Sequence, residues 1–78
     1  MFDALQIKEL VNRKPFEPFK IKMSDGSSYN VTNHDVAMVT RDFVEIGLDL
    51  DKNEIPGRIT RCAIAHITTI EDAEKQTA

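Results

Sequence analysis

Two small groups of residues have side chains that could bind a metal ion. Cys62 and His66 are separated by three residues, a spacing compatible with metal ligation, and His34 with Asp35 would add nitrogen and oxygen donors. A structural zinc site needs four ligands, usually supplied by paired Cys or His motifs, and this sequence has no such pairs. We therefore expect no metal and no cofactor. We interpret Cys62 as a small buried hydrophobic residue and His66 as a polar residue at a bend.

The same side chains do not form a pattern typical of an active site. A nucleophilic Cys62 needs a neighbouring base and an oxyanion site within a cleft, whereas the sequence around it, RITRCAIAHI, is typical of a β-strand. His34 and Asp35 are adjacent, and adjacent side chains of an extended segment point to opposite sides. The three glycines are scattered and do not form a phosphate-binding loop. The sequence therefore predicts a protein that is not an enzyme.

Four basic residues form the one candidate binding set. If the strands that carry them meet or flank one another, they could contact the phosphates of a nucleic acid. The alternative is a solvated face that keeps the strands soluble and guards a sheet edge. The chain has 10 Lys and Arg against 13 Asp and Glu, a net charge of -3, which favours the solvated face. The four residues are Lys20, Lys22, Arg58 and Arg61.

Length and composition indicate one globular domain. The chain has 78 residues, 41% of them hydrophobic and 29% charged, which is typical of a folded domain and allows one thin core over residues 1–78. No apolar run reaches the roughly 18 residues of a membrane span. The first residues have no signal-peptide pattern, and the single Cys62 cannot form an intramolecular disulfide. We therefore expect a cytoplasmic protein that does not insert into membranes.

A helix is predicted over residues 3–14. Asp3 is a favourable N-cap, and Gln6 stands at the position that completes a capping box. Pro15 ends the helix, because a residue before proline is disfavoured in the helical region. The helix is too short to be stable alone, so its apolar face must pack on another element. That face consists of Ile7, Leu10 and Val11.

A hairpin follows, with apolar residues alternating on both sides of an Asp-Gly turn. A two-residue loop would place the apolar residues of the two strands on opposite faces, whereas a three-residue loop over 24–26 places them on one face. We therefore predict the three-residue loop, which pairs Ile21 with Tyr29. Gly26 then takes the left-handed position of the loop.

The rest of the chain predicts further strands, one long acidic loop and a tail. The apolar run at 36–39 is either a strand or a turn of helix, and residues 43–48 alternate as a strand does. A loop at 49–57 precedes β-branched residues at 58–70, predicted as two short strands with a bend near 63–66, and residues 72–78 are predicted to be frayed or briefly helical.

Two resemblances support this architecture. The run PFEPFKIKMSDGSSYNV, preceded by IKELVNRK and followed by ITTIE, resembles a group of short, uncharacterised bacterial proteins with a helix, a double "PF" and a "DG" hairpin. That resemblance covers most of the chain and implies no activity. The order of helix, strand, Asp-Gly turn, curved strands and a final short strand also looks like the Sm-like small barrel.

The Sm resemblance rests on the spacing of four residues that match the first Sm motif: Met23, Asp25, Gly26 and Tyr29. Val31 stands where that motif usually has glycine, and the Arg-Gly or Lys-His signature of the second motif is missing around residues 61–67. The resemblance therefore implies the architecture and not the RNA-binding pocket. We predict an α+β domain, with an N-terminal helix packed on a strongly bent antiparallel sheet of about five strands over residues 19–71, Sm-like in outline.

The predicted function is a non-enzymatic protein-interaction module. A thin sheet has edges that must be covered, and pairing with a protein partner or with a second copy would cover them. The strand within 64–70 is the expected partner surface, and the alternative is a closed monomeric barrel. The second functional hypothesis is an Sm-like nucleic-acid-binding regulator that uses the four basic residues.

Overall fold

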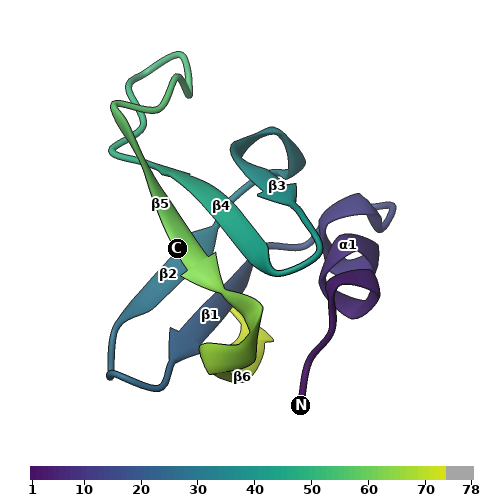
Figure 1. The fold of residues 1–78 in the computed structure, drawn as a ribbon. Coiled ribbons are helices and arrows are strands. Elements are labelled where there is room, and N and C mark those ends of the chain that lie inside the picture. The colour runs from purple at the N-terminus through teal and green to yellow at the C-terminus, as the bar shows by residue number, and fades with distance from the viewer. Residues whose placement is uncertain (74–78) are drawn as a thin grey trace.

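The computed structural model describes residues 1–73 and contains one α-helix and six strands (Figure 1). The strands form two antiparallel sheets of three strands each. The elements are α1 (Ala4–Asn12), β1 (Phe19–Met23), β2 (Ser28–Val31), η1 (His34–Val36), β3 (Ala37–Val39), β4 (Phe43–Leu48), β5 (Arg58–Ala63), η2 (Ile64–His66) and β6 (Ile67–Asp72). Sheet one has the order β2-β1-β6, and sheet two has the order β3-β4-β5.

The predicted α+β class is confirmed, whereas the number and arrangement of the strands differ from the prediction. Six strands form two sheets, in place of about five strands in one bent sheet. The strand pairings within residues 1–73 do not close a barrel. The final strand extends to Asp72, one residue into the segment predicted as a tail. Residues 74–78 of that tail lie outside the described residues.

The helix begins as predicted and ends earlier than predicted. The Asp3 carboxylate accepts a hydrogen bond from the Gln6 backbone N–H at 2.8 Å, and the Gln6 side chain accepts one from the Asp3 backbone N–H at 2.9 Å. The helix ends at Asn12, two residues before the predicted end, with Arg13 already extended at ψ 148°. The proline at 15 disfavours helix at Lys14, and the final turn unwinds with it.

The hairpin has the predicted three-residue loop. Ile21 pairs with Tyr29, the Met23 backbone N–H donates to the Ser27 carbonyl at 2.8 Å, and Gly26 has a φ of 90°. The Asp25 carboxylate accepts hydrogen bonds from the Ser27 hydroxyl at 2.5 Å and from the Ser27 backbone N–H at 2.9 Å. These bonds lower the pKa of Asp25 below its usual value, because they favour the ionised form.

Two 3₁₀ turns carry the chain between the sheets. The ambiguous run at 36–39 has both predicted structures in succession, because η1 ends at Val36 and β3 starts at Ala37. Asn33 caps this first turn, its side-chain oxygen accepting from the Asp35 backbone N–H at 2.8 Å. The bend predicted near 63–66 is the second turn, η2, which returns the chain to sheet one.

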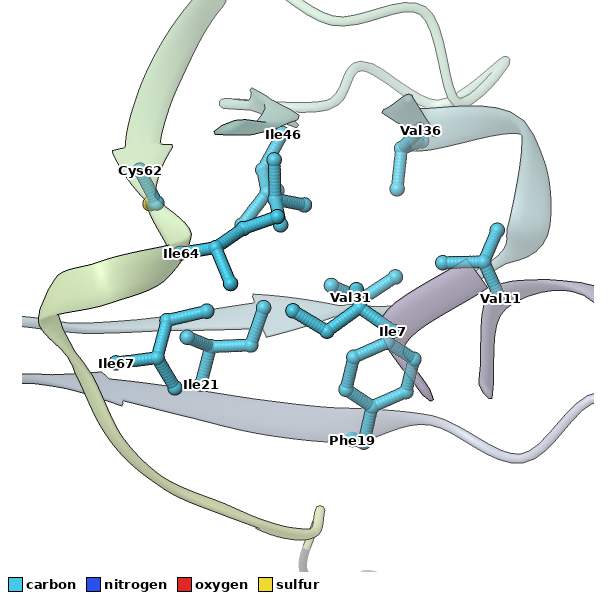
Figure 2. Close-up of a cluster of buried hydrophobic side chains, with 11 residues drawn as sticks. Ile7, Val11, Phe19, Ile21, Val31, Val36, Ile46, Cys62, Ile64 and Ile67 are labelled. Atoms are coloured by element: carbon cyan, nitrogen blue, oxygen red, sulfur yellow. The ribbon is translucent and has the colours of Figure 1, made fainter. Parts of the chain in front are cut away.

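The core lies between the two sheets and the helix (Figure 2). Figure 1 shows α1 beside the sheets, next to β3. Each strand contributes its inward side chains, so both inner faces are apolar. The buried side chains are Ile7 and Val11 from α1, Phe19, Ile21, Val31 and Ile67 from sheet one, Val44, Ile46 and Cys62 from sheet two, and Val36 and Ile64 from the two turns.

Candidate interaction surface

The outer face of sheet one is polar throughout. The strand registers place Asn30, Lys20 and Glu71 in one row across the sheet, and Ser28, Lys22 and Thr69 in the next. Lys22 Nζ lies 3.3 Å from Glu71 Oε1. This face has the composition of a solvated surface, and its charges are at least partly paired on the sheet itself.

The outer face of sheet two combines large apolar side chains with charged ones. Its rows are Met38 with Glu45 and Arg61, and Gly47 with Ile59. Met38 and Ile59 are 64% and 67% exposed, although both residues lie within strands. We call these five residues the sheet-two face. Large apolar side chains that share one exposed face are typical of contact surfaces.

A hollow of about 240 Å³ lies on the sheet-two face. Met38 and Ile59 form part of its apolar lining, together with Val36, Ala37, Gly47 and Pro56. Two acidic residues, Asp35 and Glu45, complete the lining. The hollow therefore combines an apolar surface with negative charge.

The loop between β4 and β5 supplies one wall of this hollow. The Asp51 carboxylate accepts hydrogen bonds from the backbone N–H of Asn53 at 2.8 Å and of Ile55 at 3.0 Å, which orders the loop. Pro56 then packs directly on Gly47, where an added Cβ would lie 2.6 Å from the proline ring. Only glycine at this position lets the loop approach so closely.

The structure does not bring the four predicted basic residues onto one surface. Lys20 and Lys22 lie on the outer face of β1 in sheet one, whereas Arg58 and Arg61 lie on β5 in sheet two. Side chains alternate along a strand, so Arg58 and Arg61, three positions apart, point to opposite faces of β5. The set is therefore divided between three surfaces.

Three of these cations have a nearby partner. Lys22 is paired with Glu71, and Arg58 Nε lies 2.5 Å from Asp49 Oδ2 at the base of the loop. The guanidinium carbon of Arg61 lies 4.1 Å from the centre of the Phe43 ring, a cation–π contact. The acidic partners reduce the positive potential that a nucleic acid would meet.

The candidate metal and catalytic residues are also separated by burial. Cys62 is 2% exposed in the core, and its burial raises the pKa of the thiol, whereas His66 is exposed. His34 Nδ1 lies 3.2 Å from Asp35 Oδ1, so the expectation that these side chains diverge is wrong, because the segment is a 3₁₀ turn and not extended. In residues 1–73, no group of three or more His, Cys, Asp or Glu residues could hold a metal ion.

Sequence reasoning missed two features of the structure. Arg13, directly after the helix, is partly buried and donates to the Glu17 carbonyl at 2.8 Å, and its guanidinium lies 3.6 Å from the Asp72 carboxylate. It therefore ties the helix end to β6. The second missed feature is the sheet-two face itself, for which a signal existed: with Cys62 inward, strand alternation places Ile59 outward.

Comparisons with known proteins add no relative. No family model, no curated protein and no solved structure matches this chain. Within the described part of the chain, no helix has both the length and the apolar character needed to cross a membrane.

Proposed function

We propose that this protein is a non-enzymatic protein-interaction module that binds its partner through the sheet-two face. The observation that carries the proposal is the exposure of Met38 and Ile59 around one apolar hollow. Scattered exposed hydrophobic residues are normal in small proteins, but two that line the same hollow form a surface that gains free energy when it is covered. The polar outer face of sheet one offers no comparable gain.

The hollow also indicates the chemistry of the partner. Asp35 and Glu45 supply negative charge beside the apolar lining, and Arg61 is already engaged by the Phe43 ring. A partner segment with a Lys or Arg next to an apolar residue would match both properties. Its aliphatic stem would cover Met38 and Ile59, and its cationic end would reach the carboxylates.

The test places a photo-crosslinking amino acid at Met38 in cells that produce the protein. A matched control carries the same group at Thr69, on the polar face of sheet one. We expect an adduct from position 38 that protease removes and nuclease leaves intact, and that Ile59→Lys abolishes. Equal adducts from both positions, or an adduct that Ile59→Lys does not change, would contradict the proposal.

The nucleic-acid hypothesis is an outcome of the same experiment. Lys20 and Lys22 share one face of β1, and a nuclease-sensitive adduct at Thr69 would support a regulator that binds nucleic acid there. Binding of single-stranded RNA that weakens steeply with salt would support it as well. We further propose a cytoplasmic setting, because the single cysteine is buried and unpaired.

A further inference from the structure

The strand β5 forms an open edge of sheet two (Figure 1). Within residues 1–73 it pairs only with β4. The Ile64 backbone N–H donates to the Asp42 carbonyl at 2.9 Å, and hydrogen-bonded pairs alternate along an antiparallel ladder. The even-numbered residues of β5 therefore point their backbone groups toward β4. The N–H and C=O groups of Ile59 and Arg61 point away from the sheet.

The other three edges are less suited to pairing. Strand β3 has three residues and packs against α1, and β2 has four. Strand β6 has six residues, but its ladder with β1 has a register shift between Lys22 and Met23, and such irregularities disrupt an edge. Strand β5 has six residues in an unbroken register with β4 and contains no proline. This comparison favours β5 over the edge within 64–70 that the sequence predicted.

We propose that a second copy of this chain pairs with β5 in antiparallel orientation, with Thr60 on the two-fold axis. In this register Ile59 of each copy exchanges two backbone hydrogen bonds with Arg61 of the other, which gives four bonds in total. The contact is isologous, because the same short segment faces itself.

Charge and backbone availability disfavour the two neighbouring registers. Centring the pair on Arg61 would place the two guanidinium groups directly opposite each other, which is unfavourable across a strand pair. Centring it on Ile59 would place Arg61 opposite Gly57, whose N–H already donates to Leu48 at 2.9 Å. With Thr60 at the centre, the aliphatic stem of each Arg61 lies beside the exposed Ile59 of the other copy.

The proposed dimer rests on the proposed function because it uses the edge of the same sheet. Pairing would join two sheet-two faces into one continuous six-stranded sheet, with both hollows on the same side. The two can nevertheless fail separately. A monomer that still crosslinks to a different protein at Met38 would overturn the dimer alone, and a dimer without any such adduct would overturn the binding of a different partner.

The first experiment is light scattering over a range of protein concentrations. We expect the mass to rise toward about twice the 8.8 kDa of one chain. Ile59→Pro removes an outward N–H and leaves the bonds to β4, so it should raise the dimer dissociation constant about tenfold or more. Met38→Ala, on the same face but away from the edge, is the matched control and should leave the constant within about twofold. A monomer at every concentration, or a particle much larger than a dimer, would overturn the proposal.

Disulfide trapping tests the register independently of proline. Thr60→Cys in a Cys62→Ser background places two cysteines across a non-hydrogen-bonded pair, where Cα atoms lie about 4.5 Å apart, within the range of about 4.4–6.8 Å that disulfides need. We expect rapid formation of a covalent dimer. Thr69→Cys in the same background, on β6, should crosslink at least about tenfold more slowly. Faster crosslinking through position 69 would place the contact on β6 and contradict the proposed edge.

Discussion

The two sheets have similar inner faces and different outer faces. Each has three antiparallel strands, and each contributes buried apolar side chains to the same core. The outer face of sheet one is polar, with Lys22 paired to Glu71, whereas that of sheet two exposes Met38 and Ile59 around a hollow. Core packing therefore constrains both sheets equally on the inside and leaves the outer faces free to differ. This difference is the reason for proposing sheet two, and not sheet one, as the surface that binds a partner.

The largest expected effect tests whether both sheets contribute equally to the hydrophobic core. Ile21→Ala in sheet one and Ile46→Ala in sheet two each remove a fully buried side chain, and both should lower the free energy of unfolding by about 2–5 kcal/mol. Urea denaturation followed by circular dichroism gives both values. A loss below about 1 kcal/mol for either variant would show that its sheet does not share the core as described.

The second prediction concerns the wall of the hollow. Gly47→Ala places a Cβ 2.6 Å from the Pro56 ring, so the loop must move, at a cost of about 1–3 kcal/mol of unfolding free energy. Pro56→Gly removes the obstructing ring. The double variant should therefore be more stable than the sum of the two single changes predicts, by about 1 kcal/mol.

The hairpin of sheet one supplies the control for this cycle. Gly26 has a φ of 90° and nothing within 4 Å of an added Cβ, so Gly26→Ala destabilises through backbone strain alone. It should show no coupling with Pro56→Gly. Equal coupling of both glycines to Pro56 would mean that the coupling reflects a general loss of stability and not direct packing of Pro56 on sheet two.

Local features of both sheets could be predicted from the sequence, and their outer faces could not. The pairing of Ile21 with Tyr29 follows from the requirement that one hairpin keep its apolar residues on one side, and the cap at Asp3 depends on residues three positions apart. Both constraints act over short stretches of chain. The sequence thus specified the hairpin register and the helix start without any knowledge of the tertiary structure.

The missed features depend on long-range contacts. The hollow requires that Met38, Glu45 and Ile59 come from three different strands, and the sequence does not state which strands are neighbours. The separation of Lys20 from Arg58 has the same origin, because the chain passes from sheet one to sheet two at the turn His34–Val36, and the sequence does not show that a change of sheet occurs there. The contact between Arg13 and Asp72 was not predicted because the two residues are far apart in the sequence.

The smallest expected effect tests whether sheet one's outer face is only a solvated surface. The side chains of Lys22 and Glu71 are each about half exposed, and an ion pair of this kind contributes about 0–1 kcal/mol because water and salt screen it. A double-mutant cycle with Lys22→Ala and Glu71→Ala should therefore give a coupling near the low end of that range, and this coupling should vanish at high salt.

Ile59→Lys, on the outer face of sheet two, should change the free energy of unfolding just as little, because Ile59 is already 67% exposed. It should nevertheless abolish crosslinking at Met38. A large loss of partner binding from the Lys22 or Glu71 change, with Ile59→Lys silent, would reverse the assignment of the two faces.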